Sequence, residues 1–225
     1  MHPTRPSRVS FSTDPGPALH FQAMPNHESA PAPRRFRVPR PVKATGIALL
    51  VFILSAGAFF GSLQLDGNVH VVEPGQLVRS AQLSKAGFAR VIHDQGIKSI
   101  VNLRGAHPGA GWYDNEVAVS DSLGVAHFDF GLSAEHMVTP GQIDEILALI
   151  RRAPKPVLIH CQGGADRSGL VAALYEAEIA GRSSEVADQQ LSLRYGHFPY
   201  LTSRTGAMDR SFWAYIADHS PAAAR

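Results

Sequence analysis

Hydrophobic positions divide the chain of 225 residues into three parts. Residues 1–43 hold nine of the sixteen prolines and show little hydrophobic periodicity, so they are predicted to be a disordered basic tail. Residues 44–65 form a run of 22 residues without a formal charge. Residues 66–225 alternate short apolar runs with amphipathic stretches, and this last part is predicted to be the folded domain.

Strand patterns alternate with helix patterns throughout residues 66–225. The predicted strands are Val69–Val72, Leu77–Arg79, Lys98–Leu103, Val125–Leu132 and Pro156–His160. The predicted helices are Lys85–Gln95, Trp112–Leu123, Pro140–Arg152, Ser168–Ala180, a helix from Ser183 or Ser184 to Tyr195, and Met208–Ala217. This alternation predicts an α/β fold in which a mainly parallel central sheet is flanked by helices on both faces.

The uncharged run at residues 44–65 is long enough for one transmembrane helix, since a bilayer needs about 20 apolar residues. Five basic residues lie in the ten positions directly before it: Arg34, Arg35, Arg37, Arg40 and Lys43. The next basic residue is Arg79, so the positive-inside rule predicts a cytoplasmic N-terminus and a domain on the periplasmic or extracytoplasmic side. An uncleaved signal anchor is favoured over a signal cleaved at Ala56-Gly-Ala58, because the apolar run continues beyond this site.

The formal net charge of +2 hides an uneven distribution. Residues 1–65 hold seven Lys/Arg and two Asp/Glu, whereas residues 66–225 hold fourteen and seventeen. The domain is therefore slightly acidic, and no nucleic-acid partner is expected. The single cysteine, Cys161, excludes an intrachain disulfide and a site built from several thiolates, and no metal or other cofactor is expected.

The segment His160-Cys-Gln-Gly-Gly-Ala-Asp-Arg-Ser-Gly169 carries the candidate chemistry. It joins an apolar strand to a helix, and its two glycines allow the backbone to curl with successive N–H groups pointing inward. The N-terminal end of the helix adds partial positive charge, so the loop forms a phosphate-sized cradle in which a cysteine loses its proton readily. The predicted phosphate-binding residues are Gln162, Gly163, Gly164, Ala165, Asp166, Arg167 and Ser168.

This segment resembles the HCxxGxxRS/T signature of the protein tyrosine phosphatase superfamily, in its compact dual-specificity branch. The resemblance covers residues 69–197. Three further segments resemble those of bacterial members, some of which are exported or membrane-attached: Leu77–Gln82, Gly96–Gly105 and Gln190–His197. It implies a cysteine-dependent phosphomonoesterase in which Cys161 forms a phosphocysteine intermediate. Arg167 can bind the phosphate oxygens in bidentate fashion, and Ser168 can offer its hydroxyl to the sulfur. His160 is expected to point away from the substrate and to hold the loop by a hydrogen bond.

The resemblance also implies a general acid, an Asp on the loop after the preceding strand, which protonates the leaving oxygen. Two carboxylates precede Cys161 at suitable spacings, Asp129 by 32 residues and Glu135 by 26. Asp129 is the usual residue type, yet its alternation with Phe128 and Phe130 places it within a strand. Glu135 falls on the loop and is one methylene longer, and the geometry slightly favours it.

Residues outside the signature segment have simpler interpretations. Arg79, Arg104 and Arg194 are expected to be solvated or salt-bridged surface residues, with recognition of a phosphorylated partner as the alternative. Trp112 and Tyr113 are expected to cap the core, with a place in the wall of the cleft as the alternative. The sequence thus favours a membrane-attached phosphatase that acts on phosphotyrosine or another phosphoprotein ester. The alternatives are a phosphatase of the same fold that acts on a phospholipid or a small phosphate ester, and a catalytically idle phosphate-binding module at the membrane.

Overall fold

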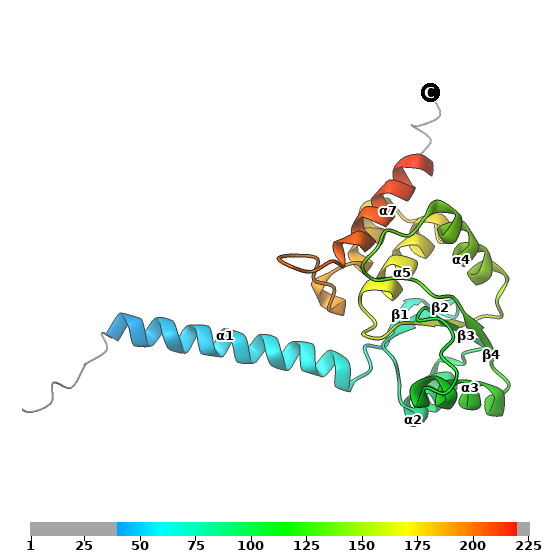
Figure 1. Ribbon diagram of the computed structural model, residues 1–225, viewed down its shortest axis with the longest axis horizontal. Helices are drawn as coiled ribbons and strands as arrows, with labels where there is room; N and C mark the ends of the chain where they lie inside the picture. Colours follow the sequence, from blue (N-terminus) through cyan, green and yellow to red (C-terminus); the bar gives the residue numbers. More distant parts are fainter. Residues whose placement is uncertain (1–39, 220–225) are drawn as a thin grey trace, which may run out of the picture. The chain divides into compact units, whose positions relative to one another are not determined.

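The computed structural model describes residues 40–219, so the predicted disordered tail lies outside the described residues except for its last four (Figure 1). The helices are α1 (Arg40–Leu65), α2 (Lys85–Gln95), α3 (Gly111–Leu123), α4 (Pro140–Arg152), α5 (Asp166–Glu178), α6 (Ser184–Ala187) and α7 (Gly206–His219). The strands are β1 (His70–Glu73), β2 (Leu77–Ser80), β3 (Ser99–Asn102), β4 (Ala126–Asp129) and β5 (Val157–His160). Two short 3₁₀ helices, η1 (Asp188–Gln190) and η2 (Leu193–Tyr195), follow α6.

The five strands form one mixed sheet in the order β1-β2-β5-β3-β4. Only the edge strand β1 is antiparallel to its neighbour, and the other three pairings are parallel, so the predicted mainly parallel sheet is confirmed. The last residue of β5, His160, pairs with Ser80 of β2 and with Asn102 of β3. The carboxyl ends of the parallel strands therefore meet at one edge, where ligands bind in open α/β sheets.

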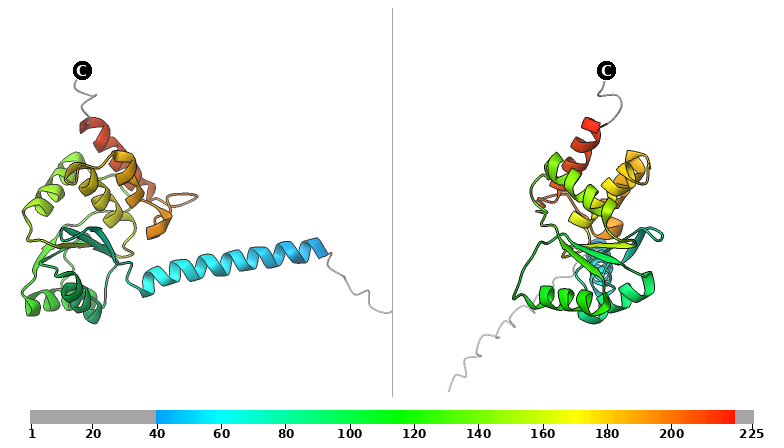
Figure 2. Two further views of the ribbon diagram at one scale, coloured as in Figure 1. Left: turned by 180° about the vertical axis from the view of Figure 1, so that it is seen from behind. Right: turned by 90° about the vertical axis from the view of Figure 1, so that its right-hand side faces the viewer.

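Helices cover both faces of the sheet, with α2 and α3 on one side and α4, α5 and α7 on the other (Figures 1 and 2). Each face has its own apolar cluster. Because successive side chains of a strand point to opposite faces, Val157 and Ile159 of β5 enter one cluster and Leu158 enters the other. All three side chains are fully buried, which fixes the end of β5 and the loop that follows it.

Helix boundaries follow the capping signals of the sequence. The Ser84 hydroxyl accepts a hydrogen bond from the Gly87 N–H at the start of α2, and Gly96 ends the helix with φ +63°. Thr139 and Gln142 form a capping box at the start of α4, with Pro140 in the first turn. The predicted bounds of α2 and α4 are confirmed.

Several other predicted bounds differ from the structure by one or two residues, and three differences lie near the signature loop or change an element. Helix α5 begins at Asp166, two residues early, which places Arg167 and Ser168 in its first turn. Strand β4 ends at Asp129 instead of Leu132, where its pairing with β3 ends. The predicted helix ending at Tyr195 is instead α6, η1 and η2, because the Gln190 carbonyl accepts a hydrogen bond from a side chain of β2 rather than from the next helical turn.

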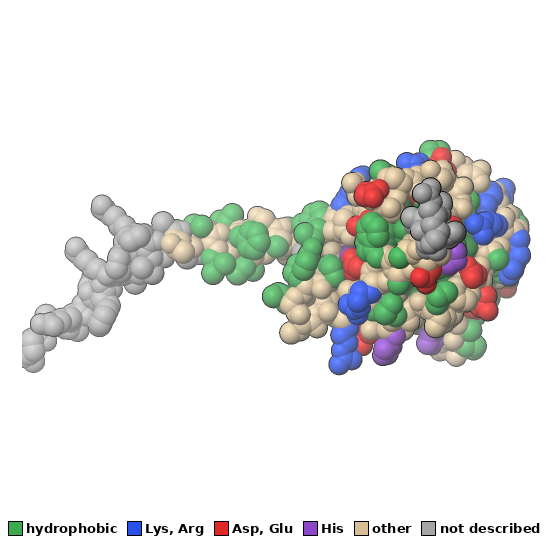
Figure 3. Space-filling model, turned by 90° about the horizontal axis from the view of Figure 1, so that it is seen from above, with side chains coloured by type: hydrophobic (Ala, Val, Ile, Leu, Met, Phe, Trp, Pro, Cys, Tyr) green, Lys and Arg blue, Asp and Glu red, His purple; other side chains and the backbone are tan. Residues whose placement is uncertain are grey.

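Residues 44–65 are helical, but their predicted role as a transmembrane helix is not supported. Within residues 40–219, no helix is both long and apolar enough to cross a membrane. Helix α1 begins at Arg40, so two basic positions that the sequence analysis placed in the tail belong to the helix. Figure 3 shows apolar side chains along α1, whereas basic and acidic side chains are interspersed on the visible face of the domain.

Candidate active site

The loop after β5 brings the predicted nucleophile together with its predicted partners. Cys161 directly follows β5 and is 2% exposed, and its Sγ lies 3.5 Å from the hydroxyl oxygen of Ser168. Arg167 and Ser168 belong to the first turn of α5. The loop from Gln162 to Ala165 therefore ends at the positive end of a helix dipole, an arrangement that favours a bound anion.

The carbonyl groups of this loop are bound from its outer side. Four successive carbonyls accept hydrogen bonds: Gln162 O from Gln82 N at 3.1 Å, Gly163 O from Asn68 Nδ2 at 3.0 Å, Gly164 O from Arg79 Nη2 at 2.8 Å, and Ala165 O from Arg79 Nη2 at 3.0 Å. In a planar trans peptide the N–H points opposite to the carbonyl. The N–H groups of residues 163–166 therefore face the inner side of the loop, as an oxyanion cradle requires.

Gly164 is the position at which this loop requires glycine. Its φ is +69°, a conformation that residues with a side chain rarely adopt. A Cβ atom there would lie 2.6 Å from the Ala81 nitrogen and 2.8 Å from the Ser80 carbonyl carbon. The tight approach of the loop to the end of β2 is thus possible only without a side chain.

Arg79 of β2 is fully buried beneath the loop, so its prediction as a surface residue was wrong. Its Nη1 donates to both the backbone carbonyl and the side-chain Oε1 of Gln190 at 2.8 Å, and its guanidinium lies 4.2 Å from the centre of the Tyr195 ring. Burial lowers the pKa of Arg79 to about 10, and the nearby Cys161 partly opposes this shift. The residue remains a cation at neutral pH and anchors two loop carbonyls.

Arg167 has one buried donor without a partner among the described residues. Its Nη1 lies 3.4 Å from the Leu103 carbonyl after β3 and 3.3 Å from the Leu132 carbonyl after β4. Its Nε is buried and has no hydrogen-bond partner among the described residues. A buried, unpaired guanidinium N–H costs free energy, and an anion beside Cys161 can satisfy it.

His160 holds the loop from behind, as predicted. Its Nε2 hydrogen-bonds the buried Glu116 carboxylate at 2.8 Å, which also binds His127 at 2.9 Å and accepts a bond from Gln82 Nε2 at 2.9 Å. Burial alone raises the pKa of Glu116, but the hydrogen bonds from His127, His160 and Gln82 outweigh it and lower the pKa to about 2. Glu116 is therefore an anion that fixes three side chains behind Cys161.

The side chain of Asp166, the first residue of α5, is bound by a buried histidine. His197 Nδ1 lies 2.7 Å from Asp166, and His197 Nε2 lies 2.9 Å from Asp209 of α7. Burial lowers the pKa of His197, but the hydrogen bonds to the two carboxylates raise it to about 9. The imidazolium therefore joins the start of α5 to α7.

Residues 60–190 match the model of a family described as the tyrosine phosphatase family, and this match includes every residue of the signature loop. The chain belongs to the tyrosine phosphatase family. This makes it a cysteine-based phosphatase, in which Cys161 and Arg167 occupy the signature positions. No curated protein sequence gives a significant match to the chain.

Solved structures share the fold of this phosphatase. The crystal structure of P. aeruginosa TpbA has 20% identity and a TM-score of 0.52, covering 66% of this chain and 91% of that chain. TpbA in complex with phosphotyrosine has 19% identity and a TM-score of 0.52, covering 67% and 91%. The catalytic domain of the S. cerevisiae PP-IP phosphatase SIW14 has 17% identity and a TM-score of 0.52, covering 63% and 83%.

The two predicted acids of the phosphatase lie in different settings. Asp129 ends β4, and its two carboxylate oxygens accept hydrogen bonds from Asn102 Nδ2 at 2.8 Å and from the Tyr113 hydroxyl at 2.6 Å. The bond to Asp129 raises the pKa of Tyr113 to about 12. Glu135 is exposed on the segment between β4 and α4 and forms an ion pair with Arg204 at 3.1 Å. Asp129 is thus fixed, whereas Glu135 is held only by a surface contact.

The entrance of the site contains residues that the sequence analysis placed elsewhere. Trp112 and Tyr113 are half-buried and lie outside both core clusters, so their prediction as core residues was wrong. Arg104 is half-buried, with its guanidinium 3.4 Å from the centre of a Trp112 ring and its Nη1 2.9 Å from Gln82 Oε1. These contacts replace the solvated or salt-bridged surface position that was expected for Arg104.

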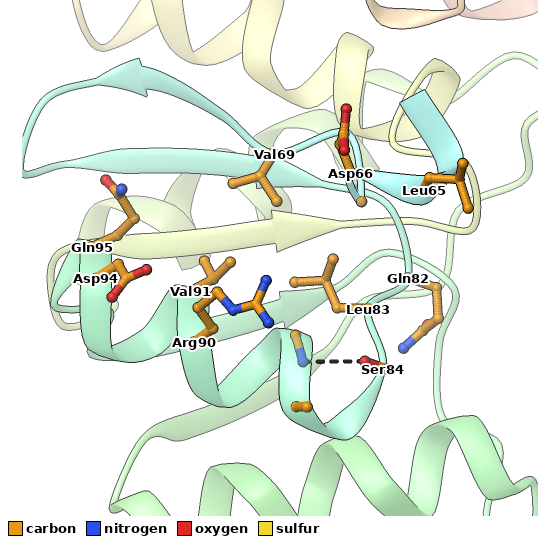
Figure 4. A pocket seen from close by; sticks show the side chains of 13 residues that line it. Leu65, Asp66, Val69, Gln82, Leu83, Ser84, Arg90, Val91, Asp94 and Gln95 are labelled. Atoms are coloured by element: carbon orange, nitrogen blue, oxygen red, sulfur yellow. Dashed lines mark hydrogen bonds between the residues drawn. The ribbon is translucent and has the colours of Figure 1, made fainter. Parts of the chain in front are cut away.

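A cavity of about 550 Å³ lies apart from the signature loop, between the segment after α1 and helix α2 (Figure 4). Leu65, Leu83 and Val91 contribute apolar side chains, and Arg90 and Asp94 contribute charges. No signature residue lines it. Its volume therefore does not mark the place where phosphate chemistry occurs.

Sequence reasoning missed the residues that support the loop from outside: Asn68, Arg79, Gln82, Glu116 and His197. One signal was present for Arg79, a charged residue between apolar and small residues of a predicted strand. Fully buried arginines are rare unless they are paired, so a charge in an interior strand indicates a specific partner. Nothing in the sequence around the other four residues identifies their contacts with the loop.

Proposed function

We propose that this phosphatase hydrolyses phosphomonoesters of phosphoproteins, with phosphotyrosine or dual specificity, through a phosphocysteine intermediate. The observation that carries the proposal is the cradle: four carbonyls of the loop between Cys161 and Arg167 are bound from outside, so the N–H groups of residues 163–166 face its inner side. Such a site matches the charge that spreads over the three equatorial oxygens of a transferring phosphoryl group.

In the first step, the Cys161 thiolate attacks phosphorus in line with the leaving oxygen. The S–P bond forms and the P–O bond breaks, and the leaving oxygen takes a proton from the general acid. Arg167 and the inward N–H groups hold the equatorial oxygens. The products of this step are the free alcohol or phenol and the phosphorylated cysteine.

In the second step, a water molecule attacks the phosphorus of phosphocysteine and gives a proton to the carboxylate that acted as acid before. The P–O bond forms, the S–P bond breaks, and inorganic phosphate leaves. The Ser168 hydroxyl, 3.5 Å from Sγ, can donate a hydrogen bond to the departing thiolate. The two steps together consume one water molecule and restore the Cys161 thiolate and the protonated general acid.

We assign the general acid to Glu135, because its segment crosses the site while Asp129 is held at both oxygens. The segment passes Arg167 at the Leu132 carbonyl, three residues before Glu135. Glu135→Gln is expected to lower kcat/KM, which reports the first step, about 100-fold for phenyl phosphate, and far less for p-nitrophenyl phosphate, whose leaving group needs little protonation. Asp129→Asn is the matched control, and an equal loss with both substrates in Glu135→Gln contradicts the assignment.

The phosphatase reaction itself is tested with p-nitrophenyl phosphate and the variants Cys161→Ser and Arg167→Lys. Turnover is expected to disappear in the first and to fall sharply in the second, because lysine cannot form the bidentate contact. Equal turnover in the wild type and Cys161→Ser overturns the proposal. Binding of phosphopeptide without phosphate release, with the cysteine reduced, supports the idle phosphate-binding module instead.

The substrate class is tested by phosphate release from a panel. Support for phosphotyrosine comes from the fold shared with TpbA, whose structure was solved in complex with phosphotyrosine. The fold is also shared with a PP-IP phosphatase, so phospholipids and small phosphate esters belong in the panel beside phosphopeptides. Higher kcat/KM for a phospholipid or a small ester than for any phosphopeptide contradicts the phosphoprotein assignment.

The membrane location remains a proposal that rests on the sequence. Residues 44–65 carry no formal charge, and basic residues precede them. This pattern favours a cytoplasmic N-terminus and an extracytoplasmic domain. Alkaline phosphatase fused after residue 225 tests this, because that reporter is active only where its disulfides form. Reporter activity in intact cells is expected, and an inactive fusion contradicts the proposed orientation.

A further inference from the structure

Three guanidinium groups lie around the signature loop without a carboxylate partner. In residues 40–219 the arginine ion pairs involve Arg182 and Arg204 only. Arg79 is bound by carbonyl oxygens beneath the loop, and Arg167 contacts carbonyls beside it. The third group is Arg104, which is half-buried at the entrance. Arg79 supports the loop and Arg167 binds the reacting phosphate in the proposed mechanism, so Arg104 is left without a role in it.

The chain places Arg104 beside the cradle. The preceding residue, Leu103, donates its N–H to the His160 carbonyl at 2.9 Å, and its own carbonyl contacts Arg167 Nη1 at 3.4 Å. The Arg104 guanidinium stacks on Trp112 at 3.4 Å and donates to Gln82 Oε1 at 2.9 Å. A planar cation fixed by a ring and one hydrogen bond loses little further entropy when it binds an anion.

These contacts give Arg104 no ion pair with a carboxylate among residues 40–219. Burial and the neighbouring Arg167 guanidinium lower the pKa of Arg104, so the protonated form is disfavoured by its surroundings. Nη1 is used by Gln82, and the rest of the fork can still bind two oxygens of a carboxylate or phosphate. In the proposed mechanism the phosphate at Cys161 is bound by Arg167, so these donors of Arg104 are available to a different anionic group beside it.

We propose that Arg104, stacked on Trp112, binds a second anionic group of the substrate next to the phosphate that reacts at Cys161. The inference rests on the proposed function and narrows its substrate class to phosphomonoesters with a carboxylate or second phosphate close to the reacting one. An acidic phosphopeptide and a small ester with two anionic groups both have this chemistry.

The test compares two matched substrate pairs in the full chain. One pair is a phosphotyrosine peptide with Glu or Gln next to the phosphotyrosine, and the other is phenyl phosphate with a ring carboxylate or carboxamide. The ratio of kcat/KM, anionic over neutral, is expected to be about 10 or more in the wild type, equivalent to about 1.4 kcal/mol. It is expected to fall to about 1 in Arg104→Gln and to stay intermediate in Arg104→Lys and Trp112→Leu.

Arg152→Gln is the control, because it removes an exposed positive charge from the last turn of α4, and its ratio is expected to match the wild type. General damage cancels because each ratio is measured within one variant. A preference for the anionic substrate in only one pair supports the inference and shows whether the second anionic group belongs to a peptide or to a small ester. A wild-type ratio near 1 in both pairs, or a preference that survives in Arg104→Gln, overturns it.

The neutral substrates separate this inference from the proposed function. If they release phosphate in the wild type and not in Cys161→Ser while the ratios stay near 1, the phosphatase reaction stands and the role of Arg104 is refuted. No release that depends on Cys161 from any substrate contradicts the proposed function itself, and the inference with it.

Discussion

Replacement of His197 by Gln tests whether an imidazolium joins the signature loop to α7. Both ring nitrogens of His197 lie within 2.9 Å of a carboxylate, so both must carry protons to donate. The pKa is raised from 6.5 to about 9, a difference of about 2.5 that corresponds to about 3 kcal/mol of folding free energy. Since the pKa is raised in the folded state, this stability is fully present below pH 6.5 and is lost as the pH rises through 9.

The assay is urea unfolding of the full chain, followed by tryptophan fluorescence at several pH values between 6 and 10. The unfolding free energy of the wild type is expected to decrease by about 3 kcal/mol more over this range than that of His197→Gln. His136→Gln is the control, because His136 is exposed and its ring contacts the Ser133 hydroxyl and no carboxylate among the described residues, so its curve is expected to follow that of the wild type. Parallel curves for the wild type and His197→Gln refute the reasoning.

Three further predictions follow from the site. Gly164→Ala is expected to abolish turnover and lower Tm, because the added Cβ would lie 2.6 Å from a backbone atom. Gly181 also has a positive φ, +68°, but has open space around it, so Gly181→Ala is expected to lower the free energy of unfolding by only about 1 kcal/mol. Equal losses of stability and turnover in the two variants contradict the account of the cradle. The pKa of Glu116 is lowered to about 2, so the wild type is expected to lose stability as the pH falls from 4.5 through 2, and Glu116→Gln to show a flatter acid limb in the same unfolding assay. Ser168→Ala is expected to slow phosphoenzyme hydrolysis about 100-fold and produce a burst of p-nitrophenolate, and an unchanged steady-state rate without a burst contradicts its role.

Local signals in the sequence predicted much of the fold. Ser84 and Gly96 delimit α2, and the Thr139-Pro140 pair starts α4, because caps satisfy backbone groups within a few residues of the chain. The signature loop was predicted for the same reason, since its chemistry lies in ten consecutive residues. Where the determining contact is local, the sequence pattern is sufficient.

Long-range contacts explain what the sequence did not predict. Arg79 was expected at the surface because its partners lie 85 to 111 residues away, at Gly164 and Gln190. The same contact ends η1 at Gln190 and breaks the predicted helix. A buried guanidinium is tolerated when its donors find carbonyls, and periodicity carries no information about such a partner.

The candidate acids illustrate an intermediate case. The residue types and spacings of Asp129 and Glu135 were readable in the sequence, but the side chains that bind each of them were not. Asn102 and Tyr113 fix Asp129, and these contacts depend on the register of β3 against β4 and on the placement of α3. Spacing therefore gave the candidates, and only the three-dimensional contacts distinguish them.

The central claim is that the thiolate of Cys161 carries the phosphoryl group during turnover. Because Cys161 is the only cysteine, rapid acid quenching after mixing with substrate, followed by mass spectrometry of the peptide that contains it, measures this directly. The account predicts one phosphoryl group on Cys161 in the wild type and none in Cys161→Ser. A phosphoryl group on another residue, or turnover with no modified cysteine at any quench time, contradicts the account.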